Sequence, residues 1–280
     1  MFEWLDRVRR EYDADPGAEW RRLEARVQNR IEYLVTMHVL NRHLPRLDTG
    51  ADAAVRVLDA GAGPGRYTIA LAECGYTMTL LDLSAGSVAF ACHQIRAAGS
   101  AVADRVEGVL VGSFIDLLPF PDAHFDAVLC LGGALSHVID AGQRLQAVRE
   151  LRRVARRHAP IVVSVGNRLA SLRGAVQWPA TWQAVVTEWN GGGLGALENG
   201  APYYELMPEE VPALIEDAGL TLLRLYGCQG IAAHLPPANL EALMADPLRW
   251  PFWRERLLAT CDHPSVIGVS CHLMAVARAP

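Results

Sequence analysis

The sequence predicts an α/β protein with a doubly wound, seven-stranded, mostly parallel sheet and a helical cap. Three observations lead to this fold class. Apolar, strand-like segments alternate with helical patterns from residue 55 to residue 166, which is typical of a parallel sheet flanked by helices. A glycine-rich turn follows the first of these segments. Two further strand-like segments close the chain, and its 280 residues, 51% of them apolar, suffice to bury a large core.

The elements follow from periodicity and from turn residues. Residues 2–44 are predicted to form two helices, because Trp4, Leu5 and Val8 repeat at helical spacing, and residues 13–17 break the pattern. Residues 45–52 are expected to be a linker. Strands are then expected near 55–60, 77–82, 107–112, 126–131 and 160–166, with helices near 65–74, 85–98 and 140–157.

The alternation stops after residue 166. Residues 167–205 carry Trp178, Trp182 and Trp189 and a glycine-rich break, and they are interpreted as a lid over a substrate, with a simple helical hairpin as the alternative. A helix at 208–218, a strand at 220–226, helices within 236–261 with a break at Pro247, and a last strand at 266–277 are expected to follow. The predicted organisation is therefore an N-terminal helical cap, residues 1–45, and a Rossmann-like domain, residues 46–280.

The turn after the first strand indicates a nucleotide-like ligand. Gly61, Gly63 and Gly65 let the backbone pass close beneath a ligand, and the helix behind them offers N–H groups to an anion. Their G-x-G-x-G spacing differs by one residue from the G-x-G-x-x-G turn of dinucleotide folds. Asp59 precedes the turn, and Asp82 ends the next apolar segment, where a carboxylate is placed to accept both ribose hydroxyls.

These segments resemble the class I S-adenosylmethionine-dependent methyltransferases, of the type that acts on small molecules. The family's first motif stands here as residues 58–65, LDAGAGPG, and its second as residues 81–84, LDLS. The loop LPFPD, residues 118–122, and the strand FDAVLC, residues 125–130, are similar to the family's fourth-strand region. The resemblance covers about residues 30–166.

The resemblance implies S-adenosylmethionine as cofactor and S-adenosylhomocysteine as product. Its amino-carboxylate is expected over the glycine turn, with the anion facing backbone N–H groups. Asp59 would orient the turn or reach the ammonium group, Asp82 would accept the ribose hydroxyls, and Leu83 would pack on the adenine. Many members place an acid after the third strand, where this chain has Ser113, with Asp116 as a possible substitute. The implied cofactor-binding residues are Asp59, Gly61, Ala62, Gly63, Asp82, Leu83, Ser113, Phe114 and Leu131.

The segment after the fourth strand holds the candidate catalytic residue. Methyl transfer is a displacement at a sulfonium that needs a base only if the nucleophile must lose a proton. Gly132 and Gly133 are expected to leave room for a substrate, and His137, with a side chain suited to accept a proton near neutral pH, is the candidate base. A capping or packing role for His137 is the alternative. Tyr12, Trp20 and Tyr33 are candidates to close over the cofactor, with core packing as the alternative.

Composition excludes several function classes. The chain has no lysine, which excludes Schiff-base chemistry and a P-loop lysine. Its net charge of −5 argues against a nucleic-acid partner, and no apolar run is long enough to predict a membrane span. The six cysteines form no C-x-x-C pair, and no metal site is expected. The N-terminus is too charged for a signal peptide, so a cytoplasmic protein, monomeric or homodimeric, is expected.

The combined reading is a transferase that moves a methyl group to O or N of a small-molecule acceptor. The absence of an Asn-Pro-Pro-Tyr-type motif argues against methylation of adenine or glutamine amino groups. Two alternatives remain open at this point. One is an NAD(P)-binding oxidoreductase, which the position of the third glycine disfavours, and the other is a non-catalytic module that binds S-adenosylmethionine.

Overall fold

The structure, a computed structural model, describes residues 3–47, 54–177, 179–197 and 200–280. The expected linker at 45–52 falls largely outside these residues, as does Trp178. The described strands of the main sheet are β1 (Arg56–Ala60), β2 (Thr77–Asp82), β3 (Val106–Val111), β4 (Ala127–Cys130), β5 (Pro160–Gly166), β8 (Thr221–Gly227) and β9 (His272–Arg278).

The seven strands lie in the order β3-β2-β1-β4-β5-β9-β8. β1 to β5 are parallel, while β9 runs antiparallel to both of its neighbours. The predicted doubly wound, mostly parallel sheet is thereby confirmed, and its closing pair of strands, β8 and β9, is antiparallel. The strand order reverses between β1 and β4, which is where open α/β sheets bind their ligands.

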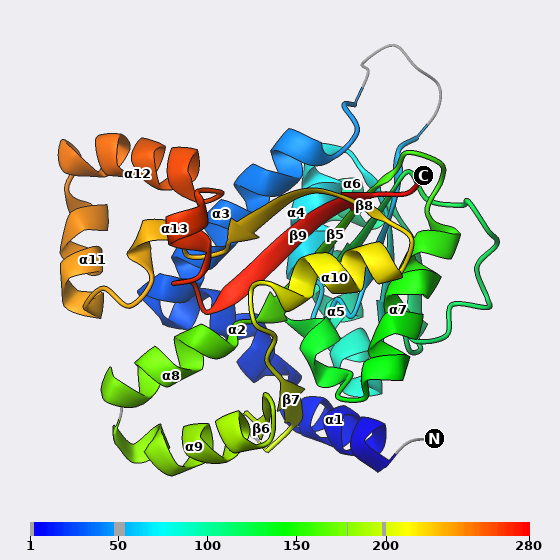
Figure 1. The fold of residues 1–280 in the computed structure, drawn as a ribbon. Coiled ribbons are helices and arrows are strands. Elements are labelled where there is room, and N and C mark those ends of the chain that lie inside the picture. Colours follow the sequence, from blue (N-terminus) through cyan, green and yellow to red (C-terminus); the bar gives the residue numbers. More distant parts are fainter. Residues whose placement is uncertain (1–2, 48–53, 178, 198–199) are drawn as a thin grey trace.

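Each face of the sheet packs against its own layer of helices (Figure 1). In β4, Ala127 and Leu129 belong to one buried cluster, and Val128 and Cys130 belong to the other, as the two-residue period of a strand requires. The first cluster includes α3 (Val27–His43), α4 (Arg66–Cys74), part of α5 (Ala85–Ala97) and α6 (Ser100–Ala103). The second includes α7 (Ala141–Val154) and α10 (Glu210–Asp217).

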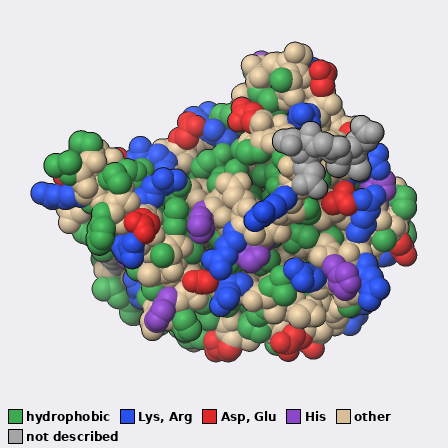
Figure 2. Space-filling model, turned by 90° about the horizontal axis from the view of Figure 1, so that it is seen from above, with side chains coloured by type: hydrophobic (Ala, Val, Ile, Leu, Met, Phe, Trp, Pro, Cys, Tyr) green, Lys and Arg blue, Asp and Glu red, His purple; other side chains and the backbone are tan. Residues whose placement is uncertain are grey.

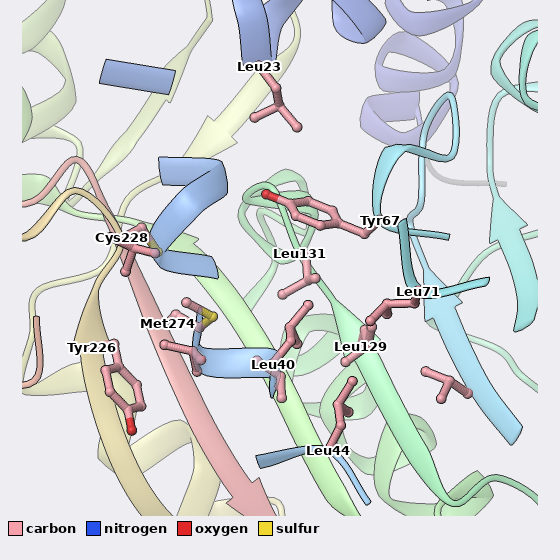
Figure 3. Packing of buried hydrophobic residues seen from close by; sticks show 14 of the residues in the cluster. Leu23, Leu40, Leu44, Tyr67, Leu71, Leu129, Leu131, Tyr226, Cys228 and Met274 are labelled. Carbon is pink, nitrogen blue, oxygen red and sulfur yellow. The ribbon is translucent and has the colours of Figure 1, made fainter. Parts of the chain in front are cut away.

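The first cluster anchors the N-terminal helices to the sheet. Leu40 of α3, Leu71 of α4, Leu129 of β4 and Met274 of β9 belong to one buried cluster, in which Leu40 lies between Met274 and Leu71 (Figure 3). All four side chains are fully buried. Burying a leucine contributes about 1.5–3 kcal/mol, so this contact makes α3 part of the domain core rather than a detachable cap.

The chain begins with three described helices where the sequence predicts two. α1 (Glu3–Ala14) ends at the expected break, and Pro16 opens α2 (Pro16–Ala25) with the Asp15 carboxylate accepting from the Ala18 N–H. A second break, not expected from the sequence, falls at Arg26, whose backbone is extended between α2 and α3. This bend turns α2 across the end of the sheet, beside α1 (Figure 1).

The insert after β5 consists of α8 (Arg168–Gln177), a 3-10 turn η2 (Pro179–Thr181), α9 (Trp182–Asn190) and a hairpin of β6 (Leu194–Ala196) and β7 (Pro202–Tyr204). A bridge between Asn167 and Leu206 holds the two ends of the insert together, next to the end of β5. The hairpin lies beside α1 at the same end of the sheet (Figure 1).

The C-terminal part adds a 3-10 turn η3 (Gly230–Ala232), α11 (Pro237–Ala245), α12 (Arg249–Thr260) and α13 (Pro264–Ile267). The predicted break near Pro247 is confirmed, because Asp246 accepts from the Leu248 and Arg249 N–H groups and so starts α12. The predicted start of the last strand at 266 is wrong. Residues 264–267 form a helical turn capped by His263, and β9 begins at His272.

The surface has mixed charge. In the view of Figure 2, arginines are interspersed with acidic and histidine side chains rather than gathered into one basic surface, which agrees with the net charge of −5. Among the described residues, none of the helices is both long and apolar enough to cross a lipid bilayer.

Candidate functional site

A cavity lies at the carboxyl ends of β1 to β4, under α1 and α2. The space between its walls measures about 940 Å³ when the open solvent at its mouth is included. Its floor is built from the turns that follow β1, β2, β3 and β4. All ten residues predicted from the sequence line it: Asp59, Gly61, Ala62, Gly63, Asp82, Leu83, Ser113, Phe114, Leu131 and His137.

The glycine turn is shaped by close packing. Gly61 has φ of +75°, and a Cβ at this position would lie 2.7 Å from the Cβ of Ala134. The sequence analysis expects backbone N–H groups to face an anion here, and four of those in the turn already have acceptors. They donate within the protein: Gly61 and Ala62 to the Leu81 carbonyl, Gly63 to Asp82 and Gly65 to the Ala62 carbonyl.

Asp82 joins the turns after β1 and β2. Its Oδ2 accepts from the Gly63 N–H at 2.7 Å and its Oδ1 from the Ser84 N–H at 2.9 Å. A carboxylate has about four acceptor positions, so two remain for hydroxyl donors from the cavity. Burial raises the pKa of Asp82 to about 6, although both N–H groups favour the ionised form.

Asp59 has an unpaired oxygen in the cavity wall. Its Oδ2 accepts from the Thr68 hydroxyl at 2.6 Å, while its buried Oδ1 has no hydrogen-bond partner among the described residues. Burial raises the pKa of this carboxyl to about 6. A buried, unsatisfied carboxylate oxygen is costly, so it marks a place where a cationic donor would be stabilised.

Of the two polar residues considered after β3, Ser113 and not Asp116 faces the cavity. Ser113 lines the cavity, and its hydroxyl also accepts from the Ile115 N–H at 3.2 Å. Asp116, the alternative from the sequence, is exposed and does not line the cavity; its carboxylate accepts from the Leu118 N–H instead.

The roof comes from α1 and α2. The residues that it contributes are Trp4, Leu5, Val8, Arg9, Tyr12, Glu19, Arg22 and Leu23. Of the three aromatic candidates, only Tyr12 lines the cavity, since Arg66 stacks on Trp20 and Tyr33 stacks on Tyr67. None of the described residues of the insert 167–205 lines it. Sequence periodicity found the helices but did not show which face covers the sheet.

An ion pair crosses the roof. The Arg22 guanidinium donates to Glu19 at 2.7 Å and lies 3.9 Å from the buried carboxylate of Glu32. A Cβ on Gly132 would lie 3.3 Å from the same guanidinium, so Arg22 rests directly against the turn after β4. Arg22 therefore lines the cavity beside the turn after β4, with its charge paired to two carboxylates.

His137 is bonded at both ring nitrogens. Its Nδ1 lies 2.8 Å from the Pro202 carbonyl, which can only accept, so Nδ1 carries the proton and Nε2 accepts from the Tyr12 hydroxyl at 2.8 Å. Burial lowers the pKa of His137 to about 4, and burial raises the pKa of Tyr12. At neutral pH this is therefore a neutral histidine that holds a tyrosine hydroxyl over the cavity.

Gly133 does not open the space that the sequence analysis assigns to a substrate. A Cβ there would overlap the hydroxyl of Tyr203, a buried side chain from β7. The glycine accommodates that tyrosine and has φ of +81°. No local signal in the sequence points to this contact, because the two residues are 70 positions apart.

Comparison with known proteins gives one family and many structures. Residues 57–158 match the family model described as "Methyltransferase domain". No curated protein sequence matches the chain.

Three solved structures illustrate the likeness. A putative methyltransferase in complex with the Haloferax volcanii Trm112 methyltransferase activator is 21% identical, with a TM-score of 0.61 over 98% of this chain and 97% of that one. The Burkholderia thailandensis 1,6-didemethyltoxoflavin-N1-methyltransferase, with bound 1,6-didemethyltoxoflavin and S-adenosylhomocysteine, is 17% identical, with a TM-score of 0.56 over 99% and 89%. A geranyl diphosphate methyltransferase in complex with GPP and sinefungin is 18% identical, with a TM-score of 0.54 over 90% and 77%. At these identities the likeness establishes the fold.

Proposed function

We propose that the chain is a class I, S-adenosylmethionine-dependent methyltransferase that methylates an oxygen or nitrogen atom of a small-molecule acceptor. The match of residues 57–158 to the model of a methyltransferase domain supports this proposal. S-adenosylmethionine is the methyl donor and S-adenosylhomocysteine the product. The observation that carries the proposal is the cavity at the carboxyl ends of β1 to β4, with its unpaired Asp59 oxygen and its roof of two helices. A recessed cavity beneath such a roof suits a small acceptor better than a protein or nucleic acid.

The residues of the cavity fit the donor. Asp59 Oδ1 is a buried acceptor without a partner, suited to the ammonium group, and Arg22 is suited to the carboxylate. The free acceptor positions of Asp82 suit the ribose hydroxyls. Leu83, Ser113 and Phe114 form the part of the wall where the adenine would lie, and the remaining turn residues, Gly61, Ala62, Gly63 and Leu131, would form the floor.

The donor supplies an electrophilic methyl group on a sulfonium. The chain's own contribution is alignment and exclusion of water, which in well-oriented reactions is worth about 7–11 kcal/mol. α1 and α2 exclude water from above, and Tyr12, held by His137, fixes α1 over the cavity. The catalytic base role expected for His137 stays a prediction, because both of its nitrogens are engaged in the free protein.

Ligand binding and turnover test the proposal. We expect micromolar binding of S-adenosylmethionine and S-adenosylhomocysteine in calorimetry and no binding of NADH. We then expect release of S-adenosylhomocysteine with at least one acceptor from a panel of phenols, naphthols, thiophenols, indoles and aromatic amines. Donor binding without turnover of any panel member would contradict the proposal and favour the non-catalytic module.

Donor binding is expected to weaken as the pH falls through about 6. Burial raises the pKa of Asp59 and of Asp82 to about 6, and only the ionised carboxylates pair fully with ammonium and hydroxyl donors. Binding at about pH 6 should therefore release protons, whereas binding at about pH 8 should release none. Calorimetry in two buffers of different ionisation enthalpy measures the release, and an identical heat in both buffers at the lower pH would contradict it.

Asp59 and Asp82 also make the stability of the free protein depend on pH. Their raised pKa values mean that the fold binds these protons more tightly than the unfolded chain does. Their contribution to stability is therefore fully present below the unfolded pKa of about 4 and is lost as the pH rises through about 6.

A further inference from the structure

We propose that the end of the cavity beneath α1 selects an uncharged, mainly apolar methyl acceptor, whose O–H or N–H group donates a hydrogen bond to the Tyr12 oxygen. The proposal rests on the proposed function and deepens it, because it names the class of methyl acceptor and the residue that positions its reacting group. Tyr12 is thereby a positioning residue and not a base.

The lining at this end of the cavity is apolar. Trp4, Leu5 and Val8 lie at helical spacing on the face of α1 that lines the cavity. The turn after β4 contributes Ala134 and Val138. Val138 belongs to the second buried cluster, and Trp4, Leu5 and Ala134 pack against that cluster. Burial of apolar ligand surface against such walls is favourable, whereas a charged group would lose its hydration there.

The charge that α1 adds to the lining is already compensated. Arg9 also lines the cavity, and its guanidinium lies 3.4 Å from Asp6 and 3.6 Å from Asp13. The Arg9 side chain is 40% exposed, so solvent screens its charge as well. A carboxylate or phosphate on the methyl acceptor would therefore find little at this end to offset the loss of its hydration.

His137 fixes the direction of the Tyr12 hydrogen bond. The Pro202 carbonyl of β7 accepts from His137 Nδ1 at 2.8 Å, which leaves Nε2 without a proton in the neutral ring. Nε2 therefore accepts from the Tyr12 hydroxyl, also at 2.8 Å. Burial lowers the pKa of His137 to about 4 and raises that of Tyr12, so both groups keep these states at neutral pH.

The Tyr12 oxygen can then only accept hydrogen bonds from a ligand. A phenol has one proton to donate, and the Tyr12 proton is committed to His137. Both residues line the cavity, so the remaining acceptor capacity of the oxygen is available there. A ligand hydroxyl or N–H group can use that capacity, whereas an ether, a carbonyl or a carboxylate would meet a second acceptor. The arrangement therefore selects ligands by the direction of their hydrogen bond.

The selected group would lie beside the methyl donor. The 3-10 turn η1 (Ala134–His137) packs against the glycine turn, because a Cβ on Gly61 would lie 2.7 Å from the Cβ of Ala134. Tyr12 is also close enough to Asp82 for the charge of that carboxylate to act on its hydroxyl. A hydroxyl that has been methylated has no proton left to donate to Tyr12, so the same selection favours release of the product.

Two ligands that differ in one donor test the hydrogen bond. 2-Naphthol can donate to Tyr12, and 2-fluoronaphthalene, which has nearly the same shape, cannot. Both would be titrated by calorimetry into the complex with S-adenosylhomocysteine, for the wild type and for Tyr12→Phe. We expect the affinity for 2-naphthol relative to 2-fluoronaphthalene to fall about fivefold in Tyr12→Phe. A purely structural role of Tyr12 would weaken both ligands equally, so an unchanged ratio would overturn the proposal.

A charged ligand tests the selection for uncharged methyl acceptors. 2-Naphthoate places a carboxylate where 2-naphthol has its hydroxyl, and we expect it to bind the same complex at least about 100-fold more weakly. Equal affinity for 2-naphthoate and 2-naphthol would overturn the proposal. Binding of neither uncharged naphthyl ligand, by an enzyme that methylates other members of the panel, would overturn it as well.

A matched control lies elsewhere in the structure. The Tyr226 hydroxyl bonds to His43 Nε2 at 2.7 Å, and neither residue belongs to the cavity lining. Tyr226→Phe therefore removes a similar tyrosine–histidine contact and should leave the ratio of the two affinities unchanged. Melting temperature and affinity for S-adenosylhomocysteine check that each variant folds.

Turnover separates failure of this inference from failure of the proposed function. Methylation of 2-naphthol by the wild type, with an affinity ratio that does not depend on Tyr12, would contradict the inference alone. We expect Tyr12→Phe to raise KM for 2-naphthol about fivefold, as the lost hydrogen bond requires. If the wild type methylates no panel acceptor, the proposed function fails and the inference about its acceptor fails with it.

Discussion

Replacing Asp82 by alanine is expected to lower the affinity for S-adenosylmethionine by roughly 100-fold, because each hydrogen bond to a charged group contributes about 1.5–3 kcal/mol. Two effects add. The ribose hydroxyls lose their acceptor, and the N–H groups of Gly63 and Ser84 lose the carboxylate that joins the first two turns of the cavity floor. Titration calorimetry with S-adenosylmethionine and S-adenosylhomocysteine measures the loss.

Asp116→Asn is the control for this variant. Asp116 is exposed, lies outside the cavity lining and was the alternative polar contact that the sequence offered after β3. Its substitution should leave donor affinity as in the wild type. Wild-type affinity in Asp82→Ala, with the melting temperature preserved, would remove Asp82 from the donor site.

Replacing Gly61 by alanine is expected to destabilise the fold by about 3 kcal/mol and to abolish donor binding. The substitution combines an unfavourable φ of +75° with a Cβ placed 2.7 Å from Ala134 and 3.1 Å from Phe114. A residue held at positive φ costs about 1–3 kcal/mol, and overpacking costs a similar amount. Urea unfolding of the free protein measures the first effect and calorimetry the second.

Gly192→Ala separates the two causes. Gly192 has φ of +69°, close to that of Gly61, but a Cβ there meets no heavy atom within 4 Å, so only the backbone conformation contributes. We expect Gly192→Ala to lose about 1 kcal/mol and to bind the donor normally. Equal losses of stability in the two variants would show that the contact of Gly61 with Ala134 and Phe114 contributes nothing.

Much of the fold and of the cavity floor was predictable from the sequence, since both depend on short-range patterns. The turns after β1, β2, β3 and β4 were located by the ends of apolar runs, at Gly61, Asp82, Ser113 and Leu131. The carboxyl ends of neighbouring parallel strands meet at one edge of a sheet, so identifying the strands also brought these residues together.

The roof and the hydrogen-bond partners were not predictable in the same way. The partner of His137 is Tyr12, 125 positions earlier, and the partner of Glu32 is His272, 240 positions later. Neither pair has a spacing that secondary structure dictates. The additional break at Arg26 and the helical turn at 264–267 were also missed, because each replaces a regular pattern with a local exception.

The sequence by itself determined the parallel sheet and the glycine turn with its two acids. Only the tertiary structure decided that four N–H groups of the turn are engaged, that Arg22 lines the cavity beside Gly132, and that His137 is neutral and bonded to Tyr12. The physical reason is the separation along the sequence over which each interaction acts. Periodicity and turn chemistry act between residues a few positions apart, whereas burial and hydrogen-bond partners, which set ionisation, arise from packing between segments distant in the chain.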